Sequence, residues 1–175
     1  SVCGVKWFIF PDKYGTAAIL GIDDNKELEN ISQKIVTSLK WRGILMIEFI
    51  FNIKKKKWEV IEMNGRPWLM IDFFRRLNFS FLKLLIYDYM NLDLTELIKQ
   101  YEINKKNYIK KKSMHIDLTI LQKSINNDNK NFELIKKILK KSKNISISSF
   151  DNNDLKPFVL EKSSINNKFL KNIIS

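Results

Sequence analysis

The chain has 175 residues, 45% hydrophobic and 12% aromatic, which is enough for one domain with a real core or for two small ones and excludes a wholly disordered protein. Its formal net charge is +12, but lysine is spread along the chain and arginine is scarce, which indicates AT-rich coding bias more than a nucleic-acid reader. A single cysteine, Cys3, excludes an internal disulfide framework and a cysteine zinc site, and it fits a cytoplasmic protein.

The chain is predicted to begin with a β-hairpin followed by a helix. Two β-branched and aromatic runs, 4–10 and 16–22, flank a turn that contains proline and glycine, which is typical of a hairpin. Apolar residues then recur at helical spacing over 26–40, and Asn25 is among the N-cap candidates before them. Gly43 lies in the region where this helix is predicted to stop.

A second hairpin and two helices are predicted next. The runs 44–53 and 58–64 are rich in apolar strand formers and are joined by a short lysine turn, so they should pair antiparallel. The stretches 68–77 and 79–90 have aromatic faces at helical spacing, and Asn78 is expected to break them. The core residues predicted on these helices are Phe73, Phe74, Leu77, Phe81 and Leu85.

Beyond residue 92 the hydrophobic pattern weakens. The elements predicted there are short: helices over 94–101 and 132–139, and strands within 108–118 and 145–150. The chain is therefore divided into a domain over 1–92 and a mixed, lysine- and asparagine-rich extension over 93–175. Because the chain opens almost directly on a strand and begins with serine, it is expected to be a piece of a longer protein.

Glu48, Glu62 and Asn64 lie where strand geometry brings oxygen ligands together. Glu48 interrupts an apolar strand whose other residues demand burial on at least one face, so its carboxylate needs compensation. If the hairpin turns about Lys55, Glu48 lies opposite Glu62, and Asn64 shares the face of Glu62. A divalent cation such as Mg²⁺ or Mn²⁺ would relieve the repulsion. The spacing also allows solvent-facing glutamates on a half-exposed sheet.

Gly65 and Arg66 extend this cluster beyond the strand. The guanidinium of Arg66 can hold phosphate oxygens through two parallel hydrogen bonds. Gly65 is predicted to let the backbone turn out of the strand toward a ligand. His115, the only histidine, has no nucleophile in a recognisable arrangement with it and is interpreted as structural.

The order and spacing of these motifs resemble the end of an ATP-grasp domain of the carbamoyl-phosphate-synthase-like or biotin-carboxylase-like branch. In that superfamily a glycine precedes a strand with a (V/I)EF motif, and a second strand ends in E-(I/M)-N-x-R. The matching residues here are Gly43, Ile47-Glu48-Phe49 and Glu62-Met63-Asn64-Gly65-Arg66. The resemblance implies an α+β fold, with 1–92 as the C-terminal ATP-grasp subdomain and an antiparallel sheet flanked by helices. Asn78 stands where the family usually has glycine.

The activity that this resemblance implies is ATP-dependent ligation of a small carboxylate to an amine-type nucleophile through an acyl phosphate. Glu48 and Glu62 would bridge two Mg²⁺ or Mn²⁺ ions beside ATP, and Asn64 would ligate one of them. Arg66 would be the catalytic residue that contacts phosphate or the acyl phosphate. The family's adenine-binding hinge and phosphate-binding lysines lie mostly outside this chain, so the fragment is expected to need the missing N-terminal half of the domain.

Two other interpretations stay open. The charge of +12 allows a basic nucleic-acid-binding module that would bind in a salt-dependent way without metal. A non-catalytic ATP-grasp remnant that binds a partner is the second. No membrane contact is predicted, because the longest apolar run, 43–51, is short and interrupted by Glu48.

Overall fold

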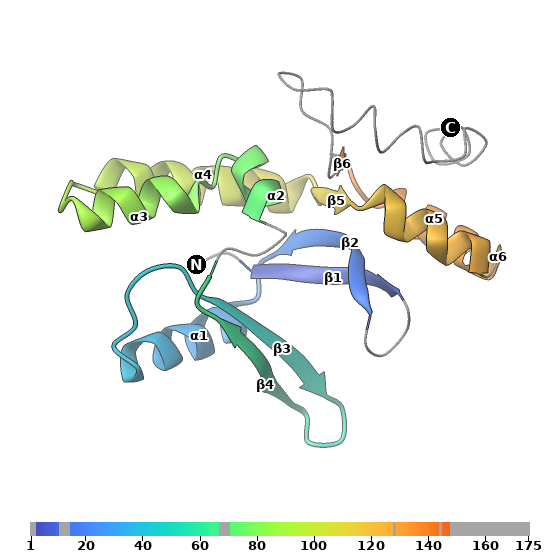
Figure 1. Ribbon diagram of the computed structural model, residues 1–175, viewed down its shortest axis with the longest axis horizontal. Coiled ribbons are helices and arrows are strands. Elements are labelled where there is room, and N and C mark those ends of the chain that lie inside the picture. The colour runs from blue at the N-terminus through green and yellow to red at the C-terminus, as the bar shows by residue number, and fades with distance from the viewer. Residues whose placement is uncertain (1–2, 11–14, 67–70, 128, 144, 148–175) are drawn as a thin grey trace. The chain divides into compact units, whose positions relative to one another are not determined.

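The computed structural model describes residues 3–10, 15–66, 71–127, 129–143 and 145–147 (Figure 1). This part of the chain contains both helices and strands, and the strands form one mixed sheet and one antiparallel sheet. The predicted α+β class is therefore confirmed. The chain forms two compact units, one built mainly from residues 24–106 and the other from residues 4–23 together with the chain after 106. This division differs from the expected boundary at residue 92, because an early hairpin and a late strand share one sheet.

The first hairpin belongs to a four-stranded sheet in the order β1-β2-β5-β6. The strands are β1 (Cys3–Phe10), β2 (Thr16–Asp23), β5 (Met114–Ile116) and β6 (Ile145–Ile147). The predicted pairing of the first two runs is confirmed, and so are short strands within the two predicted C-terminal ranges. Because β2 and β5 are antiparallel whereas β5 and β6 are parallel, this sheet is mixed rather than purely antiparallel.

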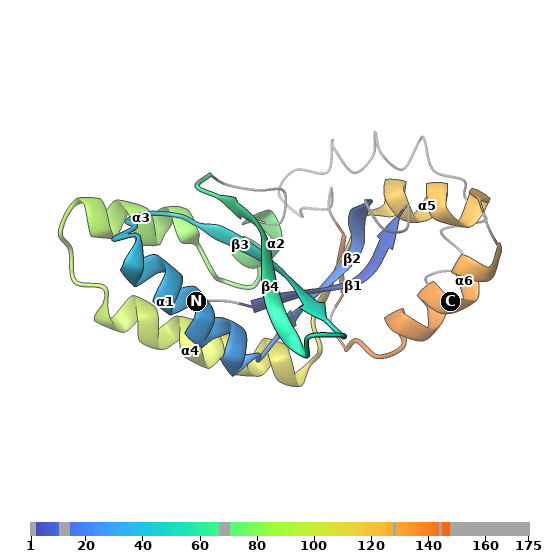
Figure 2. The ribbon, with the colours of Figure 1, turned by 90° about the horizontal axis from the view of Figure 1, so that it is seen from below.

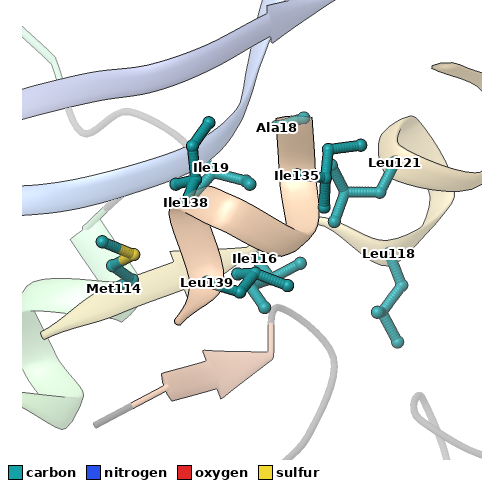
Figure 3. Close-up of a cluster of buried hydrophobic side chains, with 9 residues drawn as sticks. All are labelled: Ala18, Ile19, Met114, Ile116, Leu118, Leu121, Ile135, Ile138 and Leu139. Carbon is teal, nitrogen blue, oxygen red and sulfur yellow. The ribbon is translucent and has the colours of Figure 1, made fainter. Parts of the chain in front are cut away.

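Helices α5 (Leu118–Asn127) and α6 (Asn129–Leu139) supply the rest of the core of this unit. Figure 3 shows the cluster of buried side chains that they form with β2 and β5. Its members are Ala18, Ile19, Met114, Ile116, Leu118, Leu121, Ile135, Ile138 and Leu139. The amide of Ile120 donates a 2.9 Å hydrogen bond to Asp117 Oδ1 in the first turn of α5, a helix that was not predicted. His115 is buried in β5, and its Nδ1 is 2.9 Å from Ser146 Oγ, in keeping with a structural role.

The other unit contains the second hairpin and most of the remaining helices. Its elements are α1 (Lys26–Ser38), β3 (Met46–Asn52), β4 (Lys57–Asn64), α2 (Ile71–Arg76), α3 (Phe81–Tyr89) and the larger part of α4 (Thr95–Lys110). All six overlap predicted elements, although α4 is much longer than expected and residues 67–70 lie outside the described part. Phe73, Phe74 and Leu77 are buried as predicted, whereas Leu85 is 36% exposed.

Lys105 of α4 is buried, and its side chain reaches a carboxylate of α1; both helices are labelled on the left of Figure 2. Its ammonium donates a hydrogen bond to the carboxylate of Glu29, and its Nζ lies 4.0 Å from Asp24 Oδ1. Lys26 Nζ also contacts both carboxylates, at 3.2 Å from Asp24 Oδ1 and 3.2 Å from Glu29 Oε2. Desolvation raises the pKa of Glu29, but the hydrogen bonds from Lys105 and Lys26 outweigh it and hold that pKa below its ordinary value. The contacts of Lys105 link α4 to the N-terminal part of α1.

Helices α1 to α4 end in the same turn, in which a residue other than glycine takes the left-handed conformation. The residues concerned are Lys40, Asn78, Asn91 and Lys112, with φ between 49° and 60°. In α1, Lys40 N–H donates to Thr37 O (3.1 Å) and Trp41 N–H donates to Val36 O (3.0 Å). This is a Schellman motif. The predicted break at Asn78 is confirmed, and so is the predicted end of the first helix near Lys40, three residues before Gly43.

Candidate functional site

The register of the β3–β4 hairpin brings the two predicted glutamates face to face. Glu48 of β3 is the direct partner of Glu62 in β4, and Met46 is the partner of Asn64. Because alternate residues of a strand share a face, Glu48, Glu62 and Asn64 lie on the same face of the hairpin. The predicted pairing of Glu48 with Glu62 is therefore confirmed, although the turn is not centred on Lys55. Near the turn Asn52 pairs with Lys57, a register offset by one residue from that of the glutamate pair.

A β-bulge lies directly beside this pair. The register shifts between Glu48, which faces Glu62, and Phe49, which faces Val60, so Ile61 is the extra residue of β4. A bulge increases the local twist and re-aims the side chains next to it. The glutamate pair therefore occupies the point where the hairpin bends, and no pattern in the sequence predicted this irregularity.

Asn64 is tied to Glu62 at the end of β4. Its Nδ2 donates a 2.7 Å hydrogen bond to Glu62 Oε1, which fixes both side chains relative to each other. Glu62 is exposed, while Glu48 and Asn64 are half-buried. The carboxylate and amide groups of this cluster are therefore accessible to a ligand from solvent.

The predicted burial around Glu48 is wrong. Ile50 and Phe51 of β3 are 53% and 44% exposed, and Ile61 of β4 is 56% exposed. Within the described residues, β3 and β4 form a two-stranded sheet of their own, without further strands beside them. So small a sheet buries few of its apolar side chains. The glutamates are brought together by strand register and not by enclosure in an apolar core.

Gly65 follows Asn64 and is packed against the indole of Trp41. A Cβ built on Gly65 would lie 2.6 Å from both Cη2 and Cζ2 of Trp41, closer than real Cβ contacts come. Among the described glycines only Gly43 has a positive φ, of 99°. The strand ends at Asn64 and the backbone bends at Gly65, as predicted. The close approach of the indole, which leaves no room for a side chain, is a second reason for glycine that the sequence did not indicate.

Within the described residues, no group of three or more His, Cys, Asp and Glu side chains could hold a metal ion, either at the hairpin or elsewhere. A cation site at the hairpin would use an amide oxygen beside two carboxylates. The hairpin presents two carboxylates and one amide, and Mg²⁺ is usually held by one or two carboxylates together with water and substrate phosphates. The donor set of Glu48, Glu62 and Asn64 therefore fits Mg²⁺ or Mn²⁺ beside a nucleotide. Arg66 is exposed directly after Gly65.

A surface depression of about 450 Å³ lies over α1, away from these residues in the sequence. It is lined by Asn30, Gln33, Lys34, Thr37 and Ser38. Among the described residues that line it there is neither a predicted site residue nor a carboxylate that could hold a cation.

Comparison of the chain with protein families, with curated proteins and with solved structures gave no match. The likeness to ATP-grasp domains rests on the motifs of the hairpin and the elements that flank it. No helix in the described part of the chain is both long and apolar enough to cross a membrane.

Proposed function

We propose that this chain carries the metal-binding hairpin of an ATP-grasp carboxylate ligase. The observation that supports this most strongly is the direct pairing of Glu48 with Glu62, with Asn64 hydrogen-bonded to Glu62 on the same face. Like charges placed opposite each other weaken a sheet, so a hairpin that keeps such a pair gains most when a cation neutralises it. The E-M-N-G-R motif, which resembles that of ATP-grasp enzymes, favours the Mg²⁺ that accompanies ATP as this cation.

Each residue of the cluster has a distinct role in this proposal. Glu48 and Glu62 supply carboxylate oxygens from facing strands, and Asn64 supplies an amide oxygen from the end of β4. Bound Mg²⁺ neutralises the charge that develops on the phosphate oxygens. Arg66 lies two residues after Asn64 and provides a guanidinium for a phosphate or acyl-phosphate oxygen.

The reaction proposed is ligation in two steps. A carboxylate oxygen of the substrate attacks the γ-phosphorus of ATP, and ADP leaves, which yields an acyl phosphate. An amine nitrogen then attacks the acyl carbon, inorganic phosphate leaves, and the nitrogen loses its proton. Positioning and charge stabilisation account for most of the catalysis in phosphoryl transfer, which is why cationic groups such as Arg66 matter.

The test is Mn²⁺ binding by this chain, measured by electron paramagnetic resonance with and without ATP. Mn²⁺ prefers the same oxygen ligands as Mg²⁺ and gives a direct signal for the free ion. We expect Glu48→Gln and Glu62→Gln each to weaken binding by roughly tenfold or more, since they remove a charged ligand. Equal affinity in the wild type and Glu62→Gln would contradict the proposal.

Glu59→Gln is the matched control for this experiment. Glu59 lies on the same strand and loses the same charge, but it accepts hydrogen bonds from Asn52 Nδ2 (3.0 Å) and Lys55 Nζ (2.9 Å) nearer the turn. Its substitution should leave the affinity for Mn²⁺ unchanged. An equal loss in Glu59→Gln would mean that the net charge of the hairpin, and not the Glu48–Glu62 cluster, attracts the cation.

A further inference from the structure

We infer that Trp41 is a positioning residue for the Glu48–Glu62–Asn64 cluster and that it acts through Gly65. The role of Trp41 in cation binding rests on the proposed function. Its contact with Gly65 can be tested without metal or nucleotide. Trp41 precedes β3 and Gly65 follows β4, so the indole meets the hairpin at the end that carries the cluster.

The contact occupies the space that a side chain at position 65 would need. Cη2 and Cζ2 of the indole lie where an added Cβ would approach to 2.6 Å, so any residue other than glycine must displace the ring or the strand. Trp41 is 39% exposed, which leaves the ring able to swing outward. A Cβ at position 65 is therefore expected to move the indole away while the hairpin stays folded.

Three features fix the segment that carries the indole. The Schellman motif at the end of α1 includes the 3.0 Å hydrogen bond from Trp41 N–H to Val36 O. Arg42 Nη2 lies 3.2 Å from Asp88 Oδ2, which ties the next residue to α3. Gly43 then takes a left-handed conformation with φ of 99°. The backbone on either side of Trp41 is therefore held, which places the indole against Gly65 in the folded chain.

The indole contacts the backbone at Gly65, which lies between two residues of the proposed site. Asn64 precedes it and donates the 2.7 Å hydrogen bond to Glu62, while Arg66 follows it. The end of a two-stranded hairpin otherwise frays, because few packed neighbours hold it. By resting on the backbone at Gly65, the indole holds Asn64 in line with the glutamate pair and sets the direction in which Arg66 leaves the strand.

The experiment uses the side-chain amide resonance of Asn64 in the metal-free chain, recorded by ¹⁵N-resolved NMR. Glu62→Ala identifies the shift that the hydrogen bond to Glu62 causes. We expect Trp41→Ala and Gly65→Ala to move the Asn64 amide shift toward that of Glu62→Ala to a similar extent. The double variant Trp41→Ala/Gly65→Ala should move it no further than either single change, because both act through one contact.

Trp58→Phe is the control for loss of a tryptophan from the hairpin. Trp58 packs on Phe51 near the turn, with ring centroids 5.1 Å apart, and should leave the Asn64 resonance unchanged. Trp41→Phe removes the outer ring atoms that face Gly65. This variant tests the same contact if Gly65→Ala does not fold. A wild-type Asn64 resonance in both Gly65→Ala and Trp41→Phe would overturn the inference, and so would additive shifts in the double variant.

Mn²⁺ affinity separates this inference from the proposed function. If both hold, Trp41→Ala should bind Mn²⁺ about tenfold more weakly while it keeps both carboxylates. A wild-type chain that gives the expected amide shifts but binds no Mn²⁺ would overturn the proposed function alone. A chain that binds Mn²⁺ equally well with and without the indole would overturn the positioning role alone.

Discussion

Glu62→Gln is expected to stabilise the hairpin in the absence of divalent cations, although it removes a proposed metal ligand. Glu62 and Glu48 are direct cross-strand partners, and their charges repel. Glutamine removes one charge but keeps a side-chain oxygen that can accept the hydrogen bond from Asn64 Nδ2. Glu62→Gln should therefore raise the stability of the metal-free hairpin and lower its affinity for the cation. Such opposite changes are expected where charges that repel each other form a binding site for an ion of opposite charge.

The expected size of this effect follows from the register and the exposure of the pair. Two unit charges about 5 Å apart repel by roughly 0.8 kcal/mol in water, and measured cross-strand pairs fall at about 0.2–1 kcal/mol. Because Glu62 is exposed, salt will screen part of this repulsion. We expect a gain of about 0.5 kcal/mol at low ionic strength and less at high salt.

Hydrogen exchange of the β3 and β4 amides measures this effect locally. A gain of about 0.5 kcal/mol slows exchange roughly twofold in Glu62→Gln relative to the wild type. Added Mg²⁺ should slow exchange in the wild type and leave the variant unchanged. Faster exchange in Glu62→Gln without metal would refute the reasoning, because it would mean that the carboxylate stabilises the hairpin.

Three further outcomes are expected from the rest of the unit. Lys105→Met should lower the free energy of unfolding by about 1–3 kcal/mol in urea titrations, because Glu29 loses its buried partner but keeps Lys26. Lys40→Gly should raise it by about 1 kcal/mol, since glycine adopts φ of 50° without strain; no gain in melting temperature would count against this. The pKa of Glu29 is lowered, so its contribution to stability is present above the ordinary pKa of 4.5 and is lost as pH falls through the folded value. Glu29→Gln should therefore flatten the acid limb of a stability–pH curve, and an unchanged limb would contradict the assignment.

The hairpin could be predicted because it depends on local rules: a short turn between two apolar runs requires antiparallel pairing. The pairing of Glu48 with Glu62 was predicted from a turn about Lys55, but it arises because the bulge at Ile61 shifts the register by one residue. The bulge itself escaped prediction because it leaves no compositional mark. The burial of the apolar residues around Glu48 was overestimated, since burial depends on which surfaces cover the hairpin and not on the strand itself.

The remaining errors have a common physical origin in contacts between distant segments. β5 is only three residues long, so its place beside β2 depends on pairing across the chain rather than on its own pattern. The end of α4 was hard to place because Lys112 occupies a left-handed position where glycine would have signalled a stop. The contact between Trp41 and Gly65 joins residues on either side of the hairpin, and no spacing rule relates them.

Paramagnetic broadening by Mn²⁺ tests the central claim most directly, because it reports where a bound cation lies. Substoichiometric Mn²⁺ is added to the ¹⁵N-labelled chain with ATP, and the loss of each amide signal is followed. We predict selective loss at the backbone amides of Glu48 and Glu62 and at the side chain of Asn64, with Glu62→Gln retaining these signals. Broadening centred on other residues, or equal loss in Glu62→Gln, would contradict the assignment of the hairpin as a metal site.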